Sequence, residues 1–144
     1  MPNAKQYAAL PFTVDAGRVR VLLITSRETG RWIIPKGWPK RNVEPHRLAA
    51  LEAYEEAGLR GKISKKSLGK FTYQKLMDDG SKVQCDVIVY PLLVERQVNE
   101  WPEKGDRNCK WVKLSKAVDI VDDEGLADLL QRFRPEDSKL KKSA

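Results

Sequence analysis

The chain has 144 residues, of which 41% are apolar and 33% are charged, and its formal net charge is +7. This length fits one domain with a buried core, and the composition is typical of a globular protein. The sequence has no run of about 18 apolar residues, so we expect no membrane span. Its first residues lack the apolar core of a signal peptide, and we expect a cytoplasmic protein.

Two cysteines and one histidine limit the redox and metal chemistry that the sequence predicts. Cys85 and Cys109 fall on predicted strands, and we interpret both as buried free thiols, in keeping with a reducing cytoplasm. One histidine and two separated cysteines do not supply the usual ligand spacing of a zinc site.

The predicted strands fall into two hairpins and several single strands. In chain order, strands are expected over residues 6–14, 18–26, 32–34, 61–64, 68–77, 81–94 and 109–113. The turns Asp15-Ala16-Gly17 and Asp78-Asp79-Gly80 close the two hairpins. A polar loop over residues 95–108 precedes the last strand.

Helices are expected over residues 45–59 and 123–133, with a helical turn over residues 115–120. The apolar stripe of the terminal helix consists of Leu126, Leu129, Leu130 and Phe133. We expect residues 1–134 to form a single domain and residues 135–144 to form a charged, flexible tail. Strands first, a helix in the middle and a helix at the end predict an α/β layered fold.

Three carboxylates on the central helix are the most informative feature of the sequence. Their spacing places Glu52, Glu55 and Glu56 on one helix face, where like charges repel. No lysine or arginine lies three or four positions away within the helix. The helix is bounded by Glu44 or Asn42 as the candidate N-cap, Pro45 in the first turn and Gly58 at the stop. The pattern fits either a site for a hard divalent cation such as magnesium or a solvated acidic face.

The residues before this helix favour the first interpretation. The run Arg31-Trp32-Ile33-Ile34-Pro35-Lys36-Gly37-Trp38-Pro39 is a short apolar strand that enters a Pro/Gly/Lys turn. Together with the helix it resembles the signature of the Nudix hydrolase family. That signature runs Gly, five residues, Glu, seven residues, Arg-Glu-aliphatic-any-Glu-Glu-any-Gly-aliphatic. The matching positions are Gly37, Glu52, the pair Glu55-Glu56, and Gly58-Leu59.

Two positions depart from the signature. Val43 stands at the first glutamate and Leu51 at the arginine. In the family these positions resemble a supporting ion pair. Losing both ends of such a pair can be nearly neutral, whereas losing one end leaves a charge without a partner.

The resemblance implies both a fold and a metal site. The fold is an α/β/α sandwich with a mixed β-sheet and the glutamate-rich helix packed on it. The implied reaction is hydrolysis of a phosphoanhydride bond in a nucleoside diphosphate linked to another group. Magnesium or manganese is held by Glu52, Glu55 and Glu56, with the Gly37 carbonyl as a further ligand. Glu52 either ligates the metal or orients and deprotonates the attacking water.

In many family members a general base comes from a loop outside the helix. Here the polar loop contains Glu100, Glu103 and Asp106, and loops longer than about twelve residues are often functional. Glu103 is the catalytic candidate among them. Otherwise all three are ordinary solvated acids.

The basic net charge favours a polyanionic substrate. The candidate substrate-binding residues are Arg18, Arg20, Arg27, Lys36, Trp38 and Lys40. Lys36 and Lys40 flank Gly37, where they can meet phosphate oxygens. Trp38 and Trp101 lie in polar loops and are candidates for stacking on a base, whereas Trp32 and Trp111 are expected in the core.

A narrower resemblance concerns the substrate. The run over residues 31–39 and the phrase Lys110-Trp111-Val112 resemble diphosphoinositol-polyphosphate and diadenosine-polyphosphate hydrolases. We therefore expect a polyphosphorylated small molecule as the partner, and a monomer or homodimer. The alternative is a catalytically weak Nudix module that binds a nucleotide or phosphorylated ligand. Nucleic acid is not expected, except as a 5′ end, because the sequence has no recognition motif for it.

Overall fold

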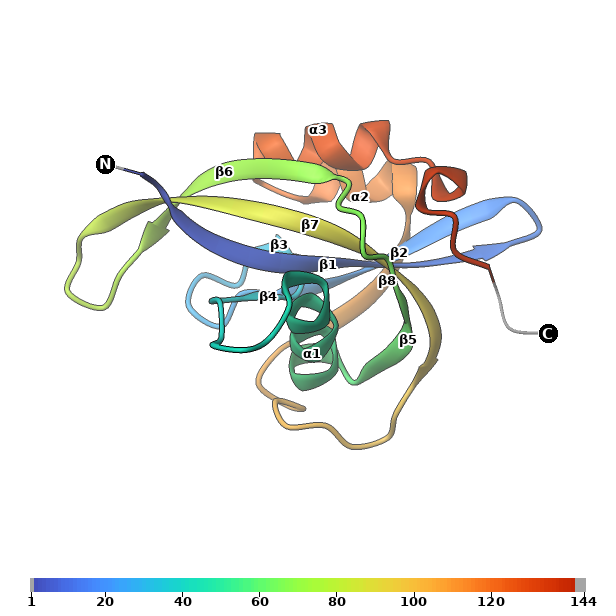
Figure 1. Cartoon of the computed structure of the whole chain (residues 1–144), viewed down its shortest axis with the longest axis horizontal. Coiled ribbons are helices and arrows are strands. Elements are labelled where there is room, and N and C mark those ends of the chain that lie inside the picture. The colour runs from blue at the N-terminus through green and yellow to red at the C-terminus, as the bar shows by residue number, and fades with distance from the viewer. Residues whose placement is uncertain (1, 142–144) are drawn as a thin grey trace.

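The structure is a computed structural model in which residues 2–141 are described (Figure 1). The strands are β1 (Ala4–Asp15), β2 (Arg18–Thr25), β3 (Trp32–Ile33), β4 (Lys36–Gly37), β5 (Leu59–Ile63), β6 (Gly69–Leu76), β7 (Lys82–Gln97) and β8 (Cys109–Lys113). The helices are α1 (Pro45–Ala57), α2 (Leu114–Ile120), α3 (Glu124–Arg132) and the 3₁₀ turn Pro135–Ser138.

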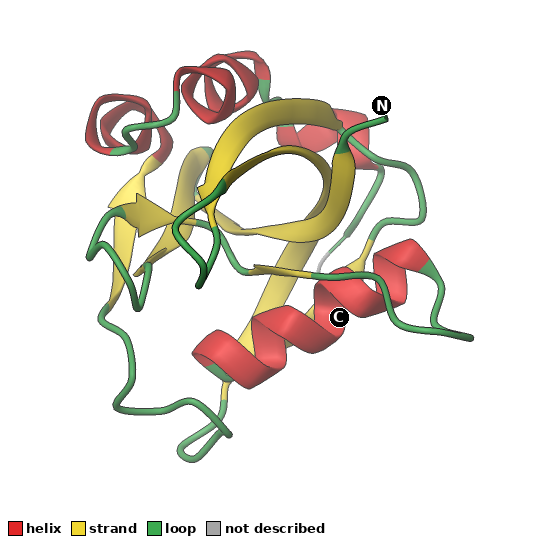
Figure 2. Cartoon of the chain, turned by 90° about the vertical axis from the view of Figure 1, so that its left-hand side faces the viewer, coloured by secondary structure: helices red, strands yellow, loops and turns green. Residues whose placement is uncertain are grey.

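All of these strands belong to one mixed sheet. Its main order is β3-β2-β1-β7-β5, with β4 paired to β1, β6 to β7 and β8 to β2. Strands β1 and β7 run parallel, whereas the other pairs are antiparallel. The first half of β1 pairs with β4 through Tyr7 and Gly37, and its second half pairs with β2 through Phe12 and Val21. The sheet is therefore strongly curved, as Figure 2 shows.

Helices cover both faces of the sheet, so the predicted α/β/α sandwich is confirmed (Figure 1). Helix α1 packs its small residues Ala49, Ala53 and Ala57 against one face. Helices α2 and α3 cover the other face, where the predicted stripe of α3 is buried. Phe12 meets Phe133 edge to face at 5.2 Å between ring centroids in that layer. Because alanine is small, the backbone of α1 lies close to the sheet, and this sets how far the glutamates of α1 stand from the sheet.

Helix α1 begins where the sequence predicts and stops at Gly58, so Leu59, which the sequence predicts to be helical, instead begins β5. Glu44 is the N-cap residue, Pro45 lies in the first turn, and Gly58 is the C-cap with φ +70°. The last turn is closed from outside the helix, since Gln97 Nε2 donates to the Ala57 carbonyl at 2.8 Å and Val98 N donates to Gly58 O at 2.8 Å. The end of α1 is thereby tied to the end of β7.

We expect Gly58→Ala to lower the free energy of unfolding by about 2 kcal/mol, more than Gly17→Ala does. Both glycines have positive φ, +70° and +76°, so both substitutions carry the same backbone penalty. A Cβ at Gly58 would also lie 2.3 Å from Trp101 Cε3, whereas one at Gly17 meets nothing within 4 Å. Urea denaturation of the two variants measures the difference. Equal losses would contradict the role given to the Trp101 contact.

The structure corrects several sequence predictions. Lys36–Gly37 forms the short strand β4 rather than a turn, because Ala9 N donates to Pro35 O at 3.0 Å and draws the segment onto β1. Cys85 is a buried free thiol as predicted, but Cys109 is exposed, because it begins the strand β8.

The predicted tail lies partly against the domain. Pro135–Ser138 forms a 3₁₀ turn, Leu140 packs on the core, and Lys62 Nζ donates to Lys141 O at 2.7 Å. The predicted flexibility of residues 142–144 falls outside the described residues. None of the helices formed by residues 2–141 is long and apolar enough to cross a lipid bilayer.

Candidate active site

Two glutamates of α1 are buried side by side. Glu52 is 9% exposed and Glu56 is 4% exposed, whereas Glu55 is half-buried at the edge of the same face. Burial, followed by the nearby charge of Glu55, raises the pKa of Glu52 to about 7. Burial raises the pKa of Glu56 to about 8 against the opposing effect of Arg107, with Glu52 and Glu103 adding to the increase. Both shifts favour the neutral, protonated form of these carboxyls, and a cation bound beside them would favour the charged form.

Gly37 leaves room for the Glu52 side chain. A Cβ built at Gly37 would lie 2.0 Å from Glu52 Oε1 and 2.4 Å from Glu52 Cδ. Only glycine thus lets the carboxylate of Glu52 rest against β4. The sequence-predicted pair of Gly37 and Glu52 is brought into direct contact by the pairing of β4 with β1.

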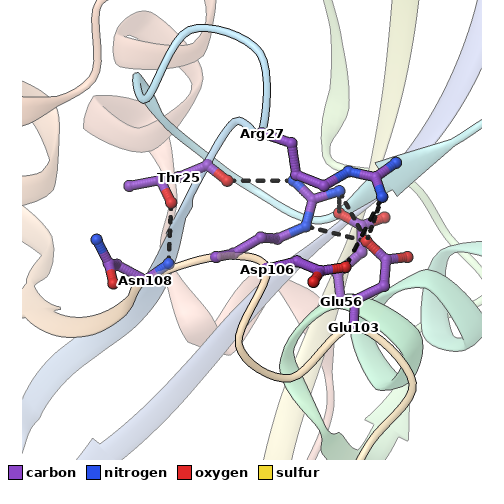
Figure 3. A network of polar contacts seen from close by, with 7 residues as sticks. Thr25, Arg27, Glu56, Glu103, Asp106 and Asn108 are labelled. Atoms are coloured by element: carbon purple, nitrogen blue, oxygen red, sulfur yellow. Dashed lines mark hydrogen bonds and ion pairs between the residues drawn. The ribbon is translucent and has the colours of Figure 1, made fainter.

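The polar loop after β7 reaches the same glutamates. Residues 98–108 form this loop, and Glu103 N donates to the Glu55 carbonyl at 2.9 Å. At the other end of the loop, Asn108 N donates to Thr25 Oγ1 at 2.9 Å (Figure 3). Thr25 N in turn donates to Asn108 O at 3.0 Å. The loop therefore spans from α1 to the end of β2 and places the Glu103 side chain beside Glu56.

Arg107 is the residue of this site that sequence reasoning missed. Its guanidinium donates to Glu103 Oε1 from Nε at 3.2 Å and from Nη2 at 3.0 Å, and Nη2 lies 3.6 Å from Glu56 Oε1. Its Nη1 donates to the Thr25 carbonyl at 3.1 Å. One signal in the sequence could have found it. The carboxylates need a cation, no lysine or arginine of α1 lies three or four positions from them, and Arg107 is the only arginine between residues 97 and 131.

The glutamates open into a cleft of about 340 Å³. Its acidic lining includes Glu52, Glu56 and Glu103, and Gly37 and Arg107 line it beside them. Its cationic and apolar lining comes from Arg27, Lys36, Trp38, Lys75, Leu76 and Met77. Burial lowers the pKa of the Lys36 ammonium, and Lys36 Nζ lies 5.1 Å from the Tyr73 ring centroid. Arg27 and Lys75 also line the cleft, so a polyanion can meet positive charge beside the carboxylates.

Among residues 2–141, Trp38 and Leu76 are the large apolar side chains that stay exposed, at 40% and 53%. Both line this cleft, and Lys75 Nζ lies 5.9 Å from the Trp38 ring centroid. Leu76 ends β6, which belongs to the second predicted hairpin. These two side chains are therefore candidates for contact with an apolar part of a ligand.

The structure separates the other predicted substrate-binding residues. Arg27 lines the cleft and lies 3.8 Å from Glu103 Oε1, and Lys40 Nζ lies 3.8 Å from Glu55 Oε1. Arg18 instead lines a cavity next to α2 and α3, and Arg20 is exposed on β2 opposite Lys113. The expectation that Arg18 and Arg20 surround the glutamates is corrected, because the hairpin of β1 and β2 carries them away from α1.

Trp101 is also corrected. Its ring packs against Gly58, and its Nε1 is buried without a hydrogen-bond partner among the described residues. Trp101 therefore supports the end of α1 and is not free to stack on a base. The other two acids of the loop pair with cations: Glu100 Oε1 lies 3.3 Å from Lys104 Nζ, and Asp106 Oδ2 lies 3.9 Å from Arg27 Nη1.

The donor set of the site fits a hard divalent cation. As their side chains stand, no three acidic, histidine or cysteine residues among residues 2–141 converge tightly enough to enclose a metal ion. Arg107 and Lys40 partly neutralise the carboxylates instead. The site nevertheless offers the oxygen ligands that magnesium prefers. Two buried carboxylates with raised pKa values lie beside a third on the same helix face, and Gly37 leaves space for one of them.

Known proteins resemble this chain in sequence. Over 122 residues the chain is 33% identical to the chloroplastic Nudix hydrolase 21 of Arabidopsis thaliana, covering 81% of this chain and 58% of that protein. It is 29% identical over 119 residues to diphosphoinositol polyphosphate phosphohydrolase 3-alpha of Homo sapiens, covering 81% and 68%. No family model matches the sequence. On these similarities the chain belongs to the Nudix hydrolase family.

Solved structures share the fold. An Ap4A hydrolase binary complex from C. elegans superimposes with a TM-score of 0.67 at 21% identity, covering 95% of this chain and 99% of that one. At this identity the likeness shows the Nudix fold alone. The chain spans 58%, 56% and 66% of the length of three Arabidopsis thaliana relatives, so their activities do not transfer with the family name.

Proposed function

We propose that the chain hydrolyses a phosphoanhydride bond in a polyphosphorylated small molecule, with Mg²⁺ or Mn²⁺ as cofactor. The observation that supports this most is the buried pair Glu52 and Glu56 at the floor of a cleft whose wall carries Arg27 and Lys36. Carboxylates beside cations suit a substrate that brings both phosphates and metal to the site. We also propose a cytoplasmic location, in keeping with the free thiols of Cys85 and Cys109.

Each group has a role in this proposal. Glu52, Glu55 and Glu56 hold the cation, with the Gly37 carbonyl as a further ligand. When bound, the cation supplies neutralisation of phosphate charge and a lowered pKa for a water molecule. Lys36 and Arg27 bind phosphate oxygens in the cleft. The oxygen of a water molecule bonds to phosphorus as the bridging P–O bond breaks, and Glu103 or Glu52 accepts the proton of that water.

The cleft favours a diadenosine polyphosphate over a diphosphoinositol polyphosphate. Both carry many phosphates, but only the nucleotide brings a flat apolar base. Trp38 and Leu76 offer apolar surface at the cleft that a base can cover. An inositol polyphosphate is polar around its whole ring and leaves that surface in water.

A catalytically weak Nudix module is the second candidate. The ion pair of Arg107 with Glu56, at 3.6 Å, favours it, because this cation already occupies one carboxylate of the site. Val43 and Leu51, which replace the charged residues of the signature, favour it too. Such a module binds the same ligands without releasing phosphate.

The test is phosphate release, with identification of products, from diadenosine polyphosphates, diphosphoinositol phosphates, nucleoside triphosphates and ADP-ribose, with and without Mg²⁺ or Mn²⁺. Metal-dependent cleavage of one class is the expected result. Ligand binding without cleavage across the whole panel would reject hydrolysis and favour the catalytically weak module.

We expect Trp38→Ala to raise the KM for diadenosine tetraphosphate about tenfold, since stacking of a base on an aromatic ring contributes about 1–3 kcal/mol. The kcat should change little, because stacking binds substrate and transition state alike. Trp38→Phe keeps a ring and should keep most of the affinity. An equal loss with a diphosphoinositol polyphosphate would show that the base is not what Trp38 contacts.

A further inference from the structure

Arg107 is held at the junction of three chain segments. Its side chain is 10% exposed, and its nitrogen atoms reach Glu56 of α1, Glu103 of its own loop and the carbonyl of Thr25 at the end of β2. Figure 3 shows Glu56, Glu103 and Thr25 converging in this network. A planar guanidinium with several fixed donors can serve three acceptors at once, whereas a lysine cannot.

The loop that carries Arg107 is fastened on both sides of it. Glu103 N donates to Glu55 O at 2.9 Å before it, and Asn108 N donates to Thr25 Oγ1 at 2.9 Å after it. These bonds hold the backbone, but they do not orient the carboxylate of Glu103. The two donors of Arg107, at 3.0 and 3.2 Å, fix Glu103 Oε1 beside the glutamates of α1.

Arg107 also supplies a positive charge beside the glutamates, where α1 itself has none: its only arginine, Arg47, pairs with Glu44. Among the described residues, the cations within 4 Å of the three α1 carboxylates are Lys40 at Glu55, at 3.8 Å, and Arg107 at Glu56, at 3.6 Å. The Lys40 side chain is 48% exposed and its charge is screened by water, whereas Arg107 is nearly buried. The signature position for arginine within the helix is Leu51. A loop residue therefore provides the fixed guanidinium of this site.

We infer that Arg107 is a positioning residue of the active site: it fixes Glu103 beside Glu56 and offsets part of the carboxylate charge, which sets how tightly the site holds a divalent cation. The inference rests on the proposed function for its effect on turnover. Its effect on cation affinity does not require any substrate. Because a positive charge disfavours a cation nearby, removing it tightens metal binding, while the Glu103 carboxylate loses the two donors that orient it.

The experiment compares Arg107→Gln and Arg107→Lys with the unchanged chain. Mn²⁺ affinity is measured without substrate, from the electron paramagnetic resonance signal of free Mn²⁺, and kcat and KM are measured on the substrate that the panel identifies. For Arg107→Gln we expect the Kd for Mn²⁺ to fall at least about threefold and kcat to fall at least about tenfold with little change in KM. Arg107→Lys keeps the positive charge but loses the planar guanidinium with its several fixed donors. The Kd for Mn²⁺ should therefore stay near the original value while kcat still falls.

A control variant and the opposing outcomes make the test decisive. Arg132→Gln removes an exposed arginine from α3, on the other side of the sheet, and should change neither quantity. An unchanged or weaker Mn²⁺ affinity in Arg107→Gln would overturn the inference. So would a raised KM with unchanged kcat, which would make Arg107 a substrate ligand. If the unchanged chain hydrolyses nothing, the proposed function fails by itself, and the Mn²⁺ titration still decides the role of Arg107.

Discussion

Replacement of Glu56 by glutamine is expected to lower kcat at least about 100-fold. Glutamine has almost the same shape, but it cannot supply the negative oxygen that a divalent cation needs in a site that is 4% exposed. The fold should survive. Glu56→Gln loses the 3.6 Å ion pair with Arg107, but it also removes one of the mutually repelling charges that raise the pKa of Glu52 and Glu56. Steady-state kinetics and thermal unfolding of the same preparation check both parts.

Glu100→Gln is the matched control for this variant. Glu100 is the same residue type in the adjoining loop, but its side chain is 86% exposed and contacts only Lys104 among the described residues, at 3.3 Å. An exposed ion pair of this kind contributes little to stability, so turnover and stability should both stay near their original values. A Glu56→Gln variant that keeps full turnover would remove Glu56 from the metal site.

The sequence predicted the elements that rest on local signals. Helix α1 has Pro45 in its first turn and Gly58 at its stop, and the structure places it between these residues. The stripe Leu126, Leu129 and Leu130 has helical spacing, and all three are buried in α3. In each case neighbours in the sequence decide the conformation, so periodicity and capping suffice.

The missed features depend on contacts between distant residues. Strand β4 exists because β1 offers it backbone partners at Tyr7 and Ala8, about thirty positions earlier in the chain. Arg107 reaches Glu56 only through the path of the loop from α1 back to β2. The three carboxylates of α1 lack a neighbouring lysine or arginine on the helix, which predicts that a cation from elsewhere in the chain lies beside them. The sequence does not say which of its 27 lysines and arginines that is.

The same limit explains the false assignments. Arg18 begins β2 and Arg27 follows its end, so the direction of that strand sends Arg27 to the cleft and Arg18 to the opposite end. Trp38 and Trp101 both stand in polar loops, but only Trp38 stays exposed, because Gly58 leaves a flat surface against which Trp101 packs. Which side of a loop faces the cleft is decided by packing, and local composition carries no information on that.

Gly37→Ala is expected to lower kcat/KM about 100-fold with only a small loss of stability, since a misplacement of about 1 Å in a catalytic group can cost that much. The added Cβ would lie 2.0 Å from Glu52 Oε1, and the atoms it meets belong to the flexible end of a side chain. The Glu52 carboxylate can rotate away, so the substitution displaces a side chain of the site and leaves the strands of the sheet in place. Activity assays with Mg²⁺, together with urea denaturation, separate the two effects.

Gly61→Ala should show the reverse behaviour. A Cβ at Gly61 would lie 2.0 Å from the carbonyl oxygen of Leu93, which is backbone of the central strand β7 and cannot rotate away. We expect this variant to lose about 2 kcal/mol of unfolding free energy while the molecules that remain folded keep their turnover, since Gly61 does not line the cleft. If Gly37→Ala behaved like Gly61→Ala, losing stability while each folded molecule stayed active, then the contact between Gly37 and Glu52 would serve the sheet rather than the placement of the carboxylate.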